Sequence, residues 1–149
     1  MGKTYSFKDL SGAFAHPLAG AYTFAGQIGL GQITFTMATE RTTHDVSADG
    51  SVMVSYIAGD NGSISIECQQ TSDLHNFLLN WYNLCKTNAD LGDVSEWASA
   101  ALTVRSLVGA TTHVCRGISP AKNPDKAYAA QGGKVTWNLM AADIQALTS

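Results

Sequence analysis

Histidine and cysteine are the residues through which this chain could bind a metal ion or carry out nucleophilic catalysis. The histidines stand at positions 16, 44, 75 and 113, and the cysteines at positions 68, 85 and 115. Zinc sites usually take their ligands in close pairs such as Cys-x-x-Cys or His-x-x-x-His. The sequence contains no such pair, so we expect no metal site and no cofactor.

Two other motifs of catalysis and phosphate binding are also missing. No Gly-x-Ser-x-Gly sequence occurs to expose a nucleophilic serine. Gly26, Gly29 and Gly31 lack the Lys-Ser/Thr ending of a phosphate loop, and an apolar strand pattern follows them instead of preceding them. We expect His44, beside Asp45, to be solvated, and we expect no enzymatic activity.

The composition favours a β-rich chain with few charges. Of its 149 residues, 45% are hydrophobic, 14% are charged and 14 are glycine, which fits one domain spanning residues 1–149. The net charge is −3 and the basic residues are scattered, which argues against binding nucleic acid through its phosphates. So low a charge fits either extensive contacts between copies or an ordinary lightly charged globule.

The cysteines and the apolar segments indicate a reducing, aqueous environment. Cys68, Cys85 and Cys115 are far apart and odd in number, so we expect them to be small buried hydrophobic residues without disulfides. No window approaches the ~20 apolar residues that a membrane span requires. We therefore expect no membrane insertion and a chain made and kept in the cytosol.

Residues 62–87 contain the clearest structural pattern in the sequence. Apolar residues alternate with polar ones from Ser63 to Gln69, as in a half-buried strand. After Gln70 they recur every three or four residues, which predicts a helix that begins at Thr71 or Ser72 and covers one face of the sheet. The predicted core residues are Ile64, Ile66, Phe77, Leu78, Trp81 and Trp137.

Short strands and turns are predicted elsewhere. The strands are residues 4–10, 21–25, 33–37, 51–57, 100–108, 112–118 and 134–139. The turn at residues 59–62 predicts that strand 51–57 pairs with strand 64–69, buried on both faces, and residues 141–147 are expected to form a helical turn. Turns are expected at residues 11–12, 49–50 and 109–110, and residues 39–50 and 119–126 are expected to be loops. The predicted fold is mainly β, with two packed antiparallel sheets (a β-sandwich or barrel) and one α-helix.

The polar faces of the strands permit two interpretations. In a lone sandwich they form the solvated outer surface. If subunits join edge to edge, the same faces form the inner wall of a shared, water-filled barrel. The candidates for this wall are Thr34, Thr36, Ser63, Ser65, Glu67 and Gln69.

Several short motifs occur in an order that can be compared with a known family. They are Tyr5-Ser6-Phe7-Lys8-Asp9, Ala48-Asp49-Gly50-Ser51-Val52-Met53, Gly62-Ser63-Ile64-Ser65-Ile66, Gln70-Thr71-Ser72 leading into a helix with Leu78 and Tyr82, and the run from Ala127 to Trp137. This order resembles the tail tube proteins of contractile-tailed, myovirus-like bacteriophages over nearly the whole chain. Residues 90–105 match nothing in that family.

The resemblance implies a structural virion protein. Its copies would form hexameric rings that stack into the inner tail tube, and phage DNA would be ejected through the lumen without specific binding. The implied partners are other copies, the tail sheath protein, the tape-measure protein, and baseplate and terminator proteins. The implied location is the tail of the virion, with assembly in the host cytoplasm.

The charged segment at residues 39–50 is then the expected contact between rings. It is too long for an ordinary hairpin connection, and its charges gain little from pairing on the surface of a lone domain. The candidates are Glu40, Arg41, Thr43, His44, Asp45 and Asp49. Two alternatives remain, a type VI secretion-like tube protein and a carbohydrate-binding β-sandwich, although the latter needs exposed aromatic residues.

Overall fold

The computed structural model describes residues 9–25, 30–106, 111–126 and 128–148. Its elements are β1 (Leu10–His16), β2 (Gly20–Ala25), β3 (Leu30–Met37), β4 (Thr42–Val46), β5 (Val52–Tyr56), β6 (Gly62–Gln69), α1 (Asp73–Asp90), β7 (Ala100–Ser106), β8 (Thr111–Pro120) and β9 (Lys134–Thr148). Most of the strand predicted at residues 4–10, the turn at 109–110, Gly26 and Gly29 lie outside the described residues.

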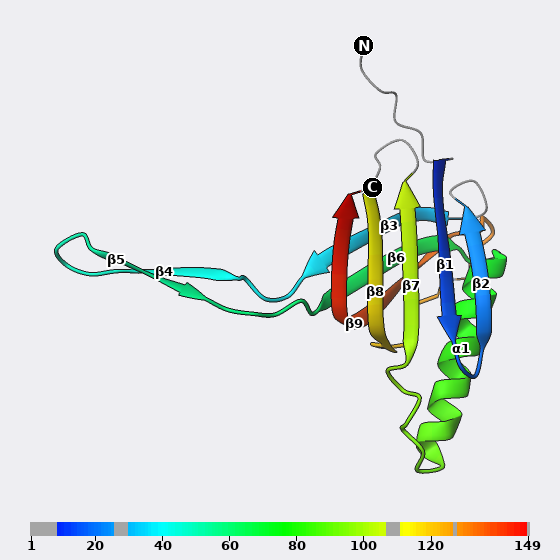
Figure 1. The fold of residues 1–149 in the computed structure, drawn as a ribbon. Helices are drawn as coiled ribbons and strands as arrows, with labels where there is room; N and C mark the ends of the chain where they lie inside the picture. The colour runs from blue at the N-terminus through cyan, green and yellow to red at the C-terminus, as the bar shows by residue number, and fades with distance from the viewer. Residues whose placement is uncertain (1–8, 26–29, 107–110, 127, 149) are drawn as a thin grey trace.

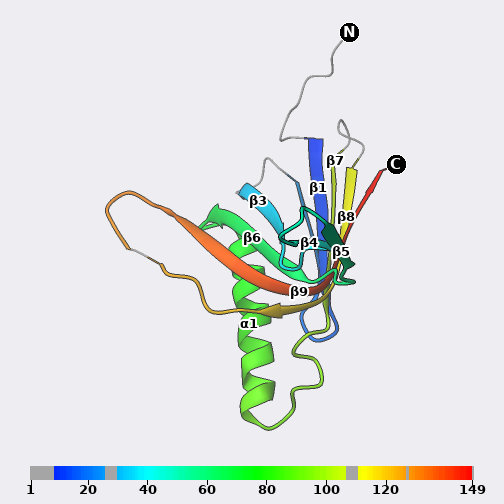
Figure 2. The same cartoon turned by 90° about the vertical axis from the view of Figure 1, so that its left-hand side faces the viewer.

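One antiparallel sheet of seven strands, in the order β2-β1-β7-β8-β9-β6-β3, forms the body of the molecule. Its 15-residue strand β9 pairs with β6 from Lys134 to Ala141 and with β8 from Leu139 to Thr148. The sheet bends along β9, so that β3 and β6 lie behind β1, β7 and β8 (Figures 1 and 2). The predicted class, mainly β with antiparallel sheets and, among the described residues, one α-helix, is confirmed. The two packed layers are parts of this one bent sheet, which ends at β2 and β3 and forms no closed barrel.

The core lies between the two layers and beneath α1. The first half of β9 contributes Val135, Trp137 and Leu139, and β6 contributes Ile64 and Ile66, all at most 1% exposed. The three cysteines are buried and unbridged, as predicted. Phe77 lies only partly buried against this core.

Helix α1 begins where the sequence predicts. The Ser72 hydroxyl accepts a hydrogen bond from the backbone N–H of His75 and donates one to the Gln69 carbonyl, which caps the helix. Trp81, from the middle of α1, packs edge-on against Phe14 of β1, with ring centroids 4.9 Å apart. The helix ends at Asp90, before Gly92 at φ +90°. Within the described ranges, no helix has the length and apolar character to cross a bilayer.

The predicted pairing around residues 59–62 is wrong. Strand β5 does not pair with β6, because β6 lies between β3 and β9. Instead β5 pairs with β4, so residues 42–46 of the loop predicted at residues 39–50 form a strand. Strand β5 is also exposed rather than buried on both faces. The alternation in residues 51–57 does mark a strand, but its apolar residues do not face the core of this chain.

Three smaller predictions also fail. Residues 141–147 continue β9 as a strand, because pairing with β8 outweighs the helix propensity of the alanines there. Ser11 and Gly12, predicted as a turn, lie in β1. Pro120, predicted in a loop, ends β8, where a proline does little harm to the pairing.

His75 and Trp137 form a buried hydrogen bond between α1 and β9. The Trp137 Nε1–H donates to His75 Nδ1 at 3.1 Å, so the histidine is neutral with its proton on Nε2. Burial first, and the charge of Lys126 second, lower the pKa of His75. Protonation of Nδ1 would break this bond and place a charge in the core.

We therefore predict that the fold loses stability as the pH falls below about 6.5, the ordinary value for histidine. The unfolded chain binds the proton at a higher pH than the folded chain, so acid favours unfolding in this range. Urea unfolding at pH 7.5, 6 and 5 measures this dependence. His75→Gln should reduce it, and the remainder includes the contribution of His113, whose pKa burial also lowers. Equal slopes for the wild type and His75→Gln would contradict the assignment.

Candidate functional site

The two-stranded ribbon of β4 and β5 projects far from the body (Figure 1). We call residues 41–57, which contain this ribbon and its turn, the arm. Every residue of the arm is exposed except Ser55, which is half-buried. The arm holds five of the six predicted ring-contact residues, Arg41, Thr43, His44, Asp45 and Asp49, and Glu40 directly precedes it.

The two faces of the arm differ in chemistry. Residues opposite each other in an antiparallel pair point to the same side, so one face combines His44 with Val54, Val46 with Val52 and Thr42 with Tyr56. We call this the apolar face; its four large residues, Val46, Val52, Val54 and Tyr56, are 50–74% exposed. The other face, the polar face of the arm, combines Thr43 with Ser55 and Asp45 with Met53.

Asp49 shapes the turn at the tip of the arm. Its carboxylate accepts hydrogen bonds from the hydroxyls of Ser47 and Ser51 and from the Ser51 N–H. These bonds, the one from Ser47 first, lower the pKa of Asp49 well below its ordinary value. Gly50 follows at φ +90°, a conformation that suits glycine. The Asp-Gly pair therefore makes a tight turn, as the sequence predicts.

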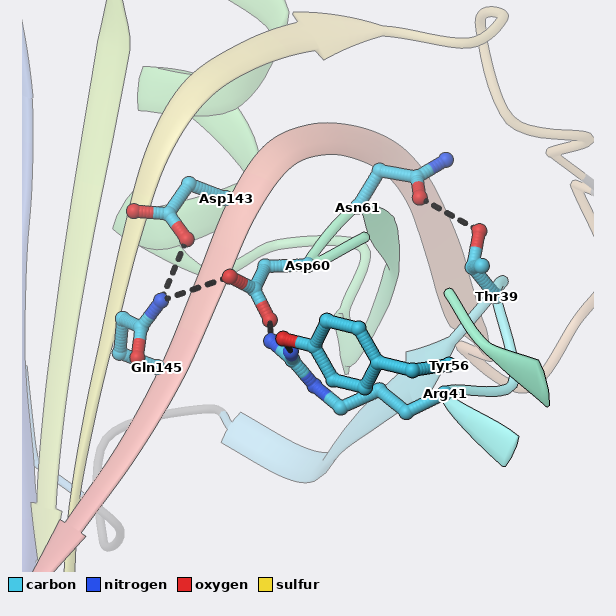
Figure 3. Close-up of polar contacts among 7 residues, drawn as sticks. All are labelled: Thr39, Arg41, Tyr56, Asp60, Asn61, Asp143 and Gln145. Carbon is cyan, nitrogen blue, oxygen red and sulfur yellow. Dashed lines mark hydrogen bonds and ion pairs between the residues drawn. The ribbon is translucent and has the colours of Figure 1, made fainter. Parts of the chain in front are cut away.

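A chain of polar contacts joins the root of the arm to the body (Figure 3). We call Arg41, Tyr56, Asp60, Asp143 and Gln145 the root cluster. The Arg41 guanidinium donates to the Tyr56 hydroxyl at 3.1 Å and forms an ion pair with Asp60. Gln145 Nε2 donates to the other oxygen of Asp60 at 3.3 Å and to Asp143 at 2.7 Å. The contacts thus run from the arm to strand β9.

Backbone hydrogen bonds hold the same junction. The Ile57 N–H donates to the Arg41 carbonyl and the Ile144 N–H donates to the Asp60 carbonyl, each at 2.8 Å. The Thr39 hydroxyl donates to Asn61 at 2.9 Å. The segment that enters the arm and the segment that leaves it are therefore tied to each other and to β9.

A second candidate surface is the outer face of β3, β6 and the first half of β9. The structure places all six predicted wall residues on β3 and β6, on the side away from the core, and pairs Thr34 with Ser65 and Thr36 with Ser63. Glu67 is opposite Thr136 and forms an ion pair of 3.5 Å with Lys134. We call this surface the polar sheet face.

Of the root cluster, sequence reasoning selected only Arg41 as a candidate site residue and missed Tyr56, Asp60, Asp143 and Gln145. Asp60 was assigned to a hairpin turn, and Gln145 is 85 residues away from it in the chain, so no local pattern connects them. Tyr56 belongs to the strand predicted at residues 51–57, which was expected to be buried on both faces, but it is 74% exposed.

Within the described part of the chain, no group of three or more His, Cys, Asp or Glu side chains is arranged to hold a metal ion. His16 Nε2 lies 2.8 Å from the Glu96 carbonyl and 3.6 Å from Cys85 Sγ. Burial raises the pKa of Cys85, which makes its thiolate scarce. This group joins β1 and α1 to the segment before β7, and its thiol is poorly suited to nucleophilic chemistry.

The comparison with known families identifies a match over residues 2–148, to the family described as Bacteriophage PhiTE tail tube protein. No match was found among curated proteins.

Solved structures share the fold at low sequence identity. A chain of the sixfold-symmetrised baseplate of the anti-feeding prophage is 12% identical, with a TM-score of 0.62 over 99% of this chain and 98% of that chain. A chain of the extended sheath-tube complex of the extracellular contractile injection system PVC is 9% identical, with a TM-score of 0.62 over 98% and 93%. A chain of the tube-terminating cap of the anti-feeding prophage is 8% identical, with a TM-score of 0.62 over 100% and 95%.

Gly62, where the arm returns to the sheet, gives a prediction about the root. A Cβ atom at this position would overlap the Thr36 carbonyl oxygen and lie 2.8 Å from Ile144 Cδ1. Because the carbonyl belongs to the backbone of β3, Gly62→Ala should destabilise the fold by about 1–3 kcal/mol. Gly132→Ala, with no atom within 4 Å of its Cβ position, should change the stability by less than about 0.5 kcal/mol. Equal urea midpoints for the two variants would contradict this packing.

Proposed function

The chain belongs to the family of phage tail tube proteins, and from that premise we propose that its copies form hexameric rings that stack into the inner tube of a contractile phage tail. The observation that carries the proposal is the match over residues 2–148 in a chain with an exposed, partly apolar arm. The sixfold symmetry of the anti-feeding prophage baseplate, which contains a chain of the same fold, supports a hexamer.

The arm is the contact that we assign to ring stacking. It extends beyond the body, so it can reach another copy without moving the sheet (Figure 1). Its valines are 50–64% exposed in the single chain, whereas contact with a neighbour would remove them from water. The arm would thus join one ring to the next.

The polar sheet face is the surface that we assign to the lumen. Its hydroxyl and amide groups are neutral, and its charges Glu67 and Lys134 offset each other as an ion pair. A wall without excess positive charge lets DNA pass without gripping its phosphates. Phage DNA would therefore be ejected through the tube without specific binding.

The further partners follow from the place of a tube in a contractile tail. We assign the outside of the tube to the sheath protein, the lumen before DNA entry to the tape-measure protein, and the two ends to baseplate and terminator proteins. Structures of the same fold come from sheath-tube, baseplate and cap assemblies, which supports this arrangement. The protein would assemble in the host cytoplasm and reside in the virion tail.

The phage tail is preferred over the two alternatives. The matched family is a phage tail tube family, which favours a phage tail over a type VI secretion-like tube. A carbohydrate-binding sandwich needs exposed aromatic rings on a face of its sheets. Tyr56 and Tyr128 are exposed, but they belong to the arm and to the segment before β9, whereas Phe24, Trp81 and Trp137 are at most 5% exposed and Tyr22 and Phe35 pack against the core.

We predict that the purified chain forms rings and tubes, and that a variant whose arm is replaced by a short Gly-Ser link forms rings only. The whole ribbon of residues 42–56 must be replaced, because removal of β4 alone leaves β5 unpaired. The body keeps its own pairing, so circular dichroism should still report a folded sheet. Negative-stain electron microscopy and pelleting measure the tubes. Tubes of normal length from the armless variant would assign stacking to another segment, such as residues 120–126.

We also predict that Glu67→Arg phage assemble normally but eject DNA several-fold more slowly. The substitution breaks the ion pair with Lys134 and places two cations side by side on every copy that faces the lumen, where phosphates would bind them. Asp90→Arg, which makes the same change of charge at the exposed end of α1, is the matched control. Equal ejection rates of Glu67→Arg and wild-type phage in a dye-release assay would show that Glu67 does not line the lumen.

A further inference from the structure

We propose that the arm docks on a second copy of this chain through its apolar face, and that the root cluster holds this face in the orientation for docking. The inference rests on the proposed function, because it specifies how an arm that joins rings makes its contact. It assigns the contact to Val46, Val52, Val54 and Tyr56 instead of to the charged residues of the arm.

The first observation is the segregation of the side chains on the ribbon. All three residue pairs of the apolar face include at least one large apolar or aromatic side chain, whereas in the two residue pairs of the other face only Met53 is large and apolar. Valines side by side on one face of a ribbon gain from burial against a common surface. Two strands alone are only marginally stable in water, so a covering surface would also stabilise the arm.

The size of the apolar face indicates that the covering surface is a second copy. Strands of five residues give a face roughly 17 Å long and about 10 Å wide. This footprint, on the order of 200 Å², is well below the ~800 Å² that each partner of a stable pair usually buries. One arm therefore cannot hold a separate partner by itself. The same small contact suffices when it is repeated around a ring, because copies already joined dock their arms together.

The root cluster connects the apolar face to the body. Tyr56 belongs to that face, and its hydroxyl accepts a hydrogen bond from Arg41. Arg41 is paired with Asp60, which in turn accepts from Gln145 of β9 (Figure 3). With the ribbon itself exposed, these contacts and the nearby backbone bonds determine how the arm is rotated about its long axis.

A pair of adjacent substitutions tests the docking face. Val54 and Met53 are equally exposed, at 62% and 61%, but they lie on opposite faces of β5. Val54→Lys places a charge on the apolar face, so we expect folded rings but at least tenfold less pelletable tube than for the wild type. Met53→Lys places the same charge opposite Asp45, where it can pair, and should leave tube formation within twofold of the wild type.

A second pair of variants tests the root cluster. Arg41→Asp should broaden the distribution of distances between spin labels on Ser51→Cys and Thr136→Cys in unassembled protein, and it should reduce tube formation. The double exchange Arg41→Asp with Asp60→Arg restores an ion pair and should recover tubes and a narrow distribution. If Arg41 instead stabilised the fold through other contacts, the double exchange would not restore the narrow distribution of label distances. Loss of tubes without any change in the distribution would overturn the assigned role of the cluster.

The outcomes separate this inference from the proposed function. If the armless variant forms normal tubes, ring stacking by the arm fails. If the armless variant loses tubes but Val54→Lys keeps them, or if Val54→Lys and Met53→Lys lose them equally, the arm still joins rings and the assigned face is wrong. If Val54→Lys forms tubes that no longer bind the sheath protein, the occupant of the face is the sheath, which overturns docking on a second copy.

Discussion

The register of β6 between β3 and β9 is the constraint on which the rest of the structure depends. In this register Ile64, Ile66 and Cys68 point into the core, and the residues between them point outward. A slip by one residue would exchange the two sets and place hydroxyl and carboxylate groups against Trp81 and Trp137. The burial of the apolar set therefore also determines the polar sheet face. Core and candidate lumen wall are two consequences of one pairing.

The same register positions the arm. Gly62 begins β6 and is opposite Ala141 of β9, and just beyond it the Ile144 N–H binds the Asp60 carbonyl. The segment before Gly62 connects the arm to the sheet, and there Gln145 of β9 donates a hydrogen bond to Asp60. A few polar contacts with the body thus set the orientation of the arm. A rigid sheet with a projecting ribbon is a combination that suits repeated contacts between identical copies.

The sequence predicts the elements of this fold better than it predicts their partners. The period of two in residues 63–69 and the period near 3.6 after Gln70 identify β6 and α1, because both segments have one buried face. Strand β4 was missed since both of its sides are exposed and neither shows a buried stripe. Strand β5 was recognised but paired with the wrong neighbour. Its valines suggested burial within the chain, and the turn residues at 59–62 suggested a simple hairpin.

In the candidate site, too, the sequence predicts local features better than it predicts contacts between distant segments. Local charge and length marked residues 39–50 as unusual, and five of the six residues chosen there lie on the arm. The two-faced chemistry of the arm could not be predicted, because it depends on pairing Val46 with Val52 and His44 with Val54. The root cluster could not be predicted either, since Asp60 and Gln145 meet only after β9 has been placed beside β6.

An exposed ribbon with one apolar face can associate non-specifically before the tube assembles. The arm contains features that oppose such association. Glu40, Asp45 and Asp49 place carboxylates along the same segment as the valines, and charges near an exposed strand oppose indiscriminate pairing. The small footprint acts in the same direction, because a single contact between two arms and bodies dissociates quickly. Only copies already arranged in a ring can dock several arms at once. On the proposed contact, weakness of each arm favours stacking of complete rings over association of single chains.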